Sequence, residues 1–155
     1  MRLDLIMKGD KIPDQNHIAR HCKPMQVSNG QIQAGAFMLR TGEESISINW
    51  LEFLNCSSRE SEITEIRNIY SAKLSIGARA KIAVLNVGEV REKVLTESPD
   101  RRNLEVLHDP ITDEHNPLHN DLSHSKIYNL KQDDELIVEL ILETVRESYP
   151  AHTKK

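Results

Sequence analysis

The sequence has few of the residues that would identify a specialised class of protein. The two cysteines among 155 residues, Cys22 and Cys56, allow one disulfide at most and exclude a disulfide-built scaffold. Aromatic residues make up only 4% of the chain, so the core must consist mainly of Ile, Leu and Val. No apolar run approaches the roughly 20 residues of a membrane span, and the N-terminal apolar run is too short for a signal peptide. We therefore expect no membrane association, a cytoplasmic location and reduced thiols.

Length and charge favour one globular domain without a general affinity for nucleic acid. The length of 155 residues suits a single domain, which we place at residues 1–150, with residues 151–155 as a frayed tail. The formal net charge of -4 gives no overall attraction to polyanions. A local basic patch remains open, with a solvated face as the simpler alternative; its residues would be Arg79, Lys81, Arg91, Lys93, Arg101 and Arg102.

Hydrophobic periodicity predicts an α+β fold. Residues 32–40 and 45–53 are expected to pair as a hairpin, since Ile46, Ile48 and Trp50 alternate with small polar residues. Ser57 with Glu60 fits a capping box, which predicts a helix over 59–75. Further elements are a central strand around 80–87, a helix near 89–97, a strand at 103–109 and a C-terminal helix over about 133–150. We expect a single sheet of about four or five strands with two or three helices, the C-terminal one packed on the sheet; a mixed α/β arrangement is the alternative.

Residues 108–125, HDPITDEHNPLHNDLSHS, form a histidine-rich loop. A metal site would use His108, His115, His119 and His124 with zinc or another divalent cation. Against this, Asn116 and Pro117 are typical of a helix N-cap and first helical position, so His115 would precede that helix and could not share a face with His119. The alternatives are a solvated loop and metal-free acid–base chemistry, for which histidine is well suited near neutral pH. A loop of this length is usually functional or disordered, and its apolar residues favour an ordered loop packed over the sheet.

The segment NHIARHCKP, residues 16–24, is the second concentration of reactive side chains. Arg20 and Lys23 could hold an anion. Cys22 could act as a nucleophile, although a small buried hydrophobic residue is the simpler interpretation. If this segment meets the histidine-rich loop, one site would combine His17, Arg20, Cys22, Ser47, Asn49, His119 and His124.

The stretches HIARHCKP, SISINWLEFL and LSHSKIYNL are distributed along most of the chain, from residue 17 to residue 130. This pattern resembles a family of small bacterial proteins of unassigned function. The resemblance implies a bacterial origin and no particular activity.

Three functions are compatible with these residues. The first is an enzyme acting on a nucleotide, nucleic acid or other phosphorylated substrate. His119, His124 and His17 would be its acid–base candidates, and Arg20, Lys23, Ser47 and Asn49 its ligand-binding candidates. The second is a non-catalytic binding protein or the partner of a larger complex. The third is a metal-binding domain using the 108–124 loop. The first requires that Arg20 lie within about two side-chain lengths of His119 or His124.

Overall fold

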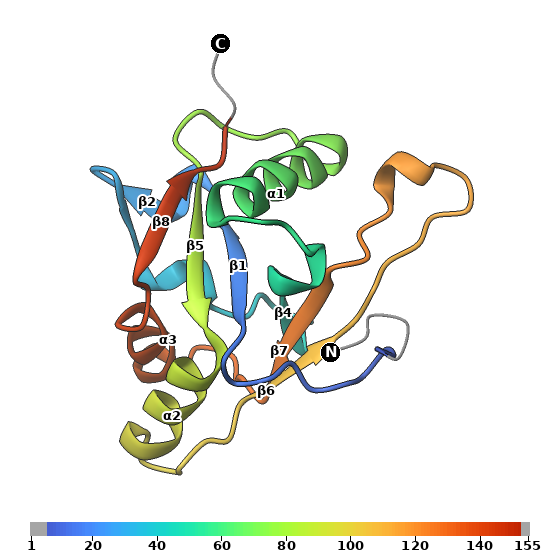
Figure 1. The fold of residues 1–155 in the computed structure, drawn as a ribbon. Coiled ribbons are helices and arrows are strands. Elements are labelled where there is room, and N and C mark those ends of the chain that lie inside the picture. The colour runs from blue at the N-terminus through green and yellow to red at the C-terminus, as the bar shows by residue number, and fades with distance from the viewer. Residues whose placement is uncertain (1–5, 153–155) are drawn as a thin grey trace.

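The computed structural model describes residues 6–152, and in that part of the chain the fold is α+β (Figure 1). Six antiparallel strands form one sheet in the order β6-β7-β4-β1-β5-β8, and β2 and β3 form a separate two-stranded sheet. The strands are β1 His17–Cys22, β2 Val27–Ser28, β3 Gln31–Ile32, β4 Ser45–Trp50, β5 Lys81–Asn86, β6 Glu105–His108, β7 His124–Tyr128 and β8 Glu147–Pro150. The α-helices are α1 Arg59–Lys73, α2 Val87–Glu97 and α3 Glu135–Leu142, and the 3₁₀ helices are η2 Pro24–Gln26, η3 Ala34–Phe37, η4 Glu52–Leu54 and η5 Pro117–His119.

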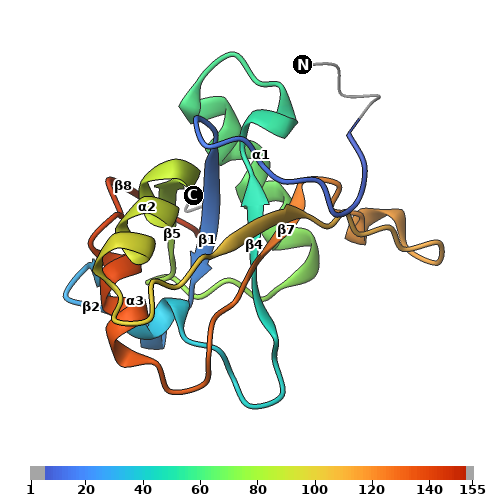
Figure 2. The same ribbon diagram turned by 90° about the horizontal axis from the view of Figure 1, so that it is seen from below.

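The sheet separates two apolar clusters. On one face α1 packs Ile63 and Ile66 against the strands β1 and β5. The helices α2 and α3 lie together on the other face (Figure 2). With η3 they cover the larger cluster, which includes Phe37 and Trp50. Because β1 and β5 lie in the middle and are covered on both faces, successive residues of β5 are buried, and this explains its nearly continuous apolar run.

The prediction of a single sheet with about four or five strands is wrong, because three segments without a clear strand pattern join it. Residues 17–22 carry histidine, arginine and cysteine, yet they form the central strand β1. Residues 124–128 and 147–150 supply β7 and the edge strand β8. All of the strand pairings are antiparallel, so the mixed α/β alternative is also wrong.

Two local predictions fail for identifiable reasons. Residues 32–40 do not pair with β4, because Ala34–Phe37 winds into η3 and buries Ala36 and Phe37 against the sheet. The C-terminal helix ends at Leu142, where Thr144 directs both its amide and its hydroxyl to the carbonyl oxygen of Ile141. The chain then continues as β8.

The end of the described chain departs from the expected frayed tail. Ala151 is buried, and its amide donates to the carbonyl oxygen of Ala80. The rest of the predicted tail, residues 153–155, lies outside the described residues, as do residues 1–5 of the predicted domain. No helix within residues 6–152 is both long enough and apolar enough to cross a bilayer.

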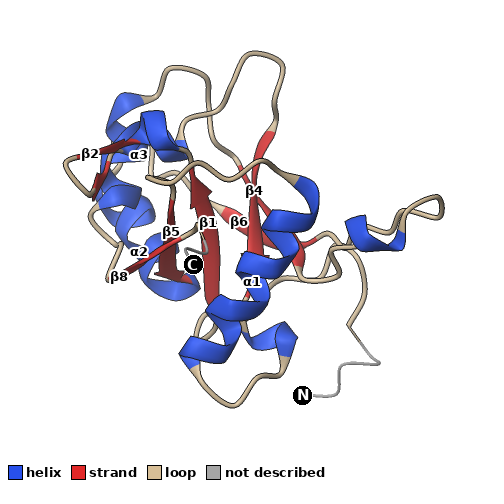
Figure 3. Ribbon diagram, turned by 90° about the horizontal axis from the view of Figure 1, so that it is seen from above, coloured by secondary structure: helices blue, strands red, loops and turns tan. Residues whose placement is uncertain are grey.

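The histidine-rich loop is an arm, residues 109–123, that projects from the body instead of lying over the sheet (Figures 1 and 3). Its base extends the β6–β7 hairpin, since the amides of Ile111 and Asp121 each donate to the carbonyl oxygen of the other. Asn116 caps η5 and Pro117 begins it, which confirms the expected helix start. Near its tip η5 contacts α1.

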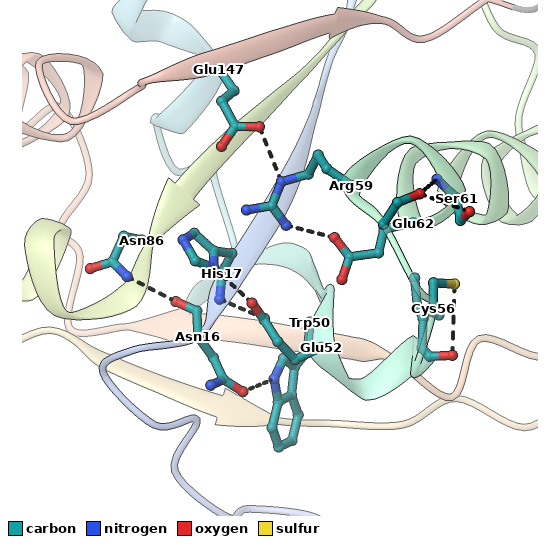
Figure 4. A network of polar contacts seen from close by, with 12 residues as sticks. Asn16, His17, Trp50, Glu52, Cys56, Arg59, Ser61, Glu62, Asn86 and Glu147 are labelled. Atoms are coloured by element: carbon teal, nitrogen blue, oxygen red, sulfur yellow. Dashed lines mark hydrogen bonds and ion pairs between the residues drawn. The ribbon is translucent and has the colours of Figure 1, made fainter.

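Trp50 joins the sheet to the segment that leads into β1. Its indole Nε1 donates to Asn16 Oδ1 over 2.8 Å, and Asn16 is itself buried (Figure 4). Trp50→Phe removes this donor and leaves the Asn16 oxygen without a partner, so we expect a loss of about 2–3 kcal/mol in unfolding free energy. Urea unfolding measures it, with Tyr128→Phe as the control. Equal midpoints for the two variants would show that the Asn16 contact contributes nothing.

Candidate functional site

A cavity of about 350 Å³ opens between the sheet and the end of α1. We call it the central cavity. Its walls come from the end of β1, from β4, from the last turn of α1 and from the base of the arm. It exists because β1 and β4 pair only at Ile18–Trp50 and Ala19–Asn49 and are not paired beyond that point.

Arg20 bridges the separation between the two strands. Its Nε donates to the carbonyl oxygen of Ala36 and its Nη1 to that of Ser47, each over 2.8 Å. No described carboxylate forms an ion pair with the guanidinium, and Nη2 has no hydrogen-bond partner among residues 6–152. Burial lowers the pKa of Arg20 from its usual value, but an arginine stays charged at neutral pH. The protein therefore holds a fixed, half-buried cation at the cavity wall.

Asp121 is the buried acid of the cavity, and the positive charge of Lys73 balances its negative charge. Its Oδ2 lies 2.6 Å from Lys73 Nζ, and its Oδ1 accepts from Asn49 Nδ2 over 2.7 Å. Asn49 Nδ2 also donates to Ser123 Oγ over 2.9 Å. This network ties α1, β4 and the arm together. It also uses both amide hydrogens of Asn49, whereas Ser47 is exposed to the cavity.

His124 presents a basic nitrogen at the cavity. Its Nδ1 lies 2.8 Å from the carbonyl oxygen of Asp109, and because a carbonyl oxygen only accepts, Nδ1 must carry the hydrogen. Burial lowers the pKa of His124, so the ring is neutral at pH 7 and its lone pair is on Nε2. Nε2 has no hydrogen-bond partner within residues 6–152, which leaves it able to accept a proton from a ligand.

His21 and Tyr70 also line the central cavity, although the sequence analysis did not select them as candidate site residues. Their rings pack with centroids 5.2 Å apart, and His21 Nε2 is buried without a partner among the described residues. Burial, with a smaller effect of Arg20 and Lys23, lowers the pKa of His21 to about 4. Burial also raises the pKa of Tyr70, whose hydroxyl makes no described hydrogen bond. Tyr70 shares an apolar helical stripe with Ile63 and Ile66, a pattern that indicates a core residue and gives no signal of a site.

Of the combined site expected from the sequence, the cavity brings together Arg20, Ser47, Asn49 and His124; the further ligand-binding candidate Lys23 also lines it. His17 lies at the opposite end of β1, where its Nδ1 is 2.7 Å from Glu52 Oε2 (Figure 4).

Two further members of that combination also lie elsewhere. Cys22 is buried in the cluster beneath α2 and α3, and burial raises the pKa of its thiol to about 11. His119 lies on η5, with Nδ1 3.5 Å from Asp113 Oδ2.

The four loop histidines do not converge on a metal site. His108 packs on the other face of the sheet, with ring centroids 5.5 Å from Trp50 and 4.9 Å from Phe53. His115 and His119 are on the arm, while His124 faces the cavity. Within residues 6–152 no three His, Cys, Asp or Glu side chains are grouped so that they could hold a metal ion.

Positive charge exceeds negative charge at the cavity. Arg20, Lys23 and Arg40 line it without forming ion pairs with any described carboxylate, and Lys73 is balanced by Asp121. The remaining acid, Glu43, lies at the rim and accepts from the Arg40 amide over 2.8 Å. A half-enclosed site with a fixed guanidinium and a neutral histidine can bind an anion and move a proton on it.

No protein-family model, curated protein or solved structure matches this chain. The resemblance carried by HIARHCKP, SISINWLEFL and LSHSKIYNL stays a prediction, and the central cavity is the feature from which a function can be proposed.

Proposed function

We propose that the chain binds a phosphorylated ligand, a nucleotide or a nucleic acid, in the central cavity and acts on it as an enzyme. The observation that carries the proposal is Arg20, whose charge is half-buried, anchored by two backbone carbonyl oxygens and unpaired with any described carboxylate. Burying an arginine without an anion is costly, and a phosphate oxygen accepting from Nη2 would offset that cost.

The other polar groups at the cavity suit phosphoryl chemistry. His124 Nε2 would accept the proton of an attacking hydroxyl or water, because Nδ1 is held as the donor. Arg20 would stabilise the charge that develops on the phosphate oxygens. The Tyr70 hydroxyl would position the substrate by a hydrogen bond, since its raised pKa keeps the proton on the oxygen.

A second candidate, docking to a partner protein, is favoured by the arm. Leu118 is 75% exposed and Leu122 is 50% exposed, on a segment that projects from the body. Exposed apolar side chains on a protruding arm are typical of a recognition surface. Size-exclusion chromatography of the wild type and of Leu118→Ser at matched concentrations tests self-association through this arm.

His124→Asn is the sharpest test of the proposed chemistry. The asparagine amide can still donate to the Asp109 carbonyl oxygen, whereas the basic Nε2 is lost. We expect turnover of a panel of nucleotides and oligonucleotides to fall at least tenfold, with ligand affinity changed little, because proton transfer by a positioned side chain is worth this much or more. His115→Asn, at the exposed tip of the arm, is the matched control.

Binding is tested separately with inorganic pyrophosphate. A ligand at ten times its dissociation constant stabilises the folded state by about 1.4 kcal/mol, which a thermal melt detects. We expect a shift in the wild type and a smaller one in a Lys23→Gln, Arg40→Gln double variant. The proposal would be contradicted if neither pyrophosphate nor any other phosphorylated compound shifted the melting temperature of the wild type. Unchanged turnover in His124→Asn would also contradict it.

A further inference from the structure

A second cavity, of about 610 Å³, lies at the edge of the molecule where β5 begins and β8 ends. We call it the edge cavity. It is lined by the β2–β3 turn, by residues 78–81 and by Pro150. Arg79 and Lys81 both line it, no acidic side chain among the described residues does, and neither cation pairs with a described carboxylate. This cavity therefore has an uncompensated positive charge of its own.

The two cavities are neighbours, separated by a narrow ridge. Lys23 and Gln26 line the central cavity, and the next residue, Val27, lines the edge cavity. The other side of the ridge runs from Leu74, which lines the first cavity, to Ala78, which lines the second.

The ridge is closed by a tight contact between its two segments. A Cβ atom at Gly77 would lie 2.4 Å from Pro24 Cγ, so only glycine permits this approach. Lys23 lies beside the contact and carries a positive charge onto the ridge itself.

Five unpaired cations gather at these two cavities. On the opposite side of the sheet three basic residues of the expected patch are engaged: Arg91 with Asp14, Lys93 with Glu97 and Glu143, and Arg102 with Asp100. Arg20, Lys23 and Arg40 line the central cavity, Arg79 and Lys81 line the edge cavity, and none of the five has a carboxylate partner within residues 6–152. The six residues of the basic patch expected from the sequence therefore do not form one surface. Of the six, only Arg79 and Lys81 line a cavity, and both lack a described carboxylate partner.

We propose that the edge cavity is a second phosphate subsite and that the ligand is a single-stranded polynucleotide running through both cavities. The inference rests on the proposed function of the central cavity and specifies its substrate class. A mononucleotide would fill one cavity and leave the other cations unpaired. A single strand follows a positively charged groove by its backbone. Leu74 and Ile111 offer the bases an apolar surface at the central cavity.

The experiment compares a labelled dinucleotide with an octanucleotide, in RNA and DNA forms, by fluorescence anisotropy at several salt concentrations. The test variant is the Arg79→Gln, Lys81→Gln double substitution. Its control is Lys11→Gln, Arg101→Gln, which removes the same charge from sites away from both cavities. We expect the wild type to bind the octamer more tightly than the dimer. The test variant should lose about tenfold in octamer affinity, bind the dimer unchanged and show a salt slope reduced by about one.

The outcomes separate this inference from the proposed function. An octamer that binds the test variant with wild-type affinity and slope would overturn the edge subsite. If the dimer and pyrophosphate still bind and the Lys23→Gln, Arg40→Gln variant weakens them, the central cavity remains an anion site. No binding of any oligonucleotide or pyrophosphate to the wild type would overturn both. A higher affinity for the RNA octamer than for the DNA octamer supports a subsite that contacts the 2′-hydroxyl as well as the phosphate. Equal affinities support a subsite that contacts only the phosphodiester.

Discussion

Asp121→Ala is expected to destabilise the protein by about 3–5 kcal/mol, the usual cost of removing one partner from a buried ion pair. The carboxylate is buried and accepts from three side chains, those of Lys73, Asn49 and Ser123. Its removal leaves the Lys73 ammonium without its carboxylate and a buried Asn49 amide without one acceptor. Because the network joins α1 to β4 and to the arm, the loss affects elements far apart in the sequence.

Urea unfolding followed by far-UV circular dichroism measures this effect. Asp121→Asn retains an acceptor oxygen and the shape of the side chain, so it should be less destabilising than Asp121→Ala. Glu143→Ala is the matched control, since Glu143 pairs with Lys93 at the surface, and its midpoint should remain close to that of the wild type. If Asp121→Ala and Glu143→Ala had the same midpoint, the buried network would not contribute to stability.

Elements with strong local signals were predictable from the sequence. The helix expected over 59–75 is α1, Arg59–Lys73, although its N-cap is Ser58, which accepts from the Ser61 amide, and not Ser57. The apolar run around 80–87 is β5. In these segments periodicity and capping residues point to the same structure, so local preference and tertiary packing agree.

The central strand β1 could not be identified in this way, because only part of it faces the core. Ile18 and Ala19 are fully buried, whereas Arg20 and His21 lie at the cavity, where the pairing with β4 has ended. A strand whose second half lines a site has no alternating apolar pattern there. The polar residues that concealed the strand are the ones that form the candidate site.

Local pattern also explains which residues of the central cavity could be predicted from the sequence. Ser47 and Asn49 were recognisable because small polar residues alternate with Ile46, Ile48 and Trp50 on a half-buried strand. Lys73 and Asp121 were not, since one lies in a helix and the other in the arm, and only the tertiary fold brings them within 2.6 Å. His17 and Arg20 are three residues apart, yet they lie toward opposite ends of β1, because a strand extends by about 3.3 Å per residue.

Acidification from pH 7 to about 5 is expected to destabilise the protein, because two buried histidines and one half-buried histidine would have to become charged. Burial lowers the pKa of His21, His108 and His124 in the folded state. In the unfolded chain each histidine binds a proton near pH 6.5. Between these values the unfolded state binds more protons than the folded state, so the unfolding free energy falls as the pH falls. Carboxylates with lowered pKa, such as Asp109 and Glu147, add to the loss only at more acidic pH.

His21→Phe isolates the largest of these contributions. Phenylalanine keeps the packing against Tyr70 and has no nitrogen to protonate beside Arg20 and Lys23. A full shift from 6.5 to about 4 would correspond to about 3 kcal/mol, and because His21 is half-buried, solvent screening reduces this to about 1–2 kcal/mol. Urea unfolding at successive pH values, in buffers without phosphate so that the central cavity stays unliganded, should show a shallower pH dependence than in His115→Gln. An identical dependence in the two variants would assign the acid sensitivity to His108, His124 or the carboxylates and would show that His21 accepts a proton in the folded state.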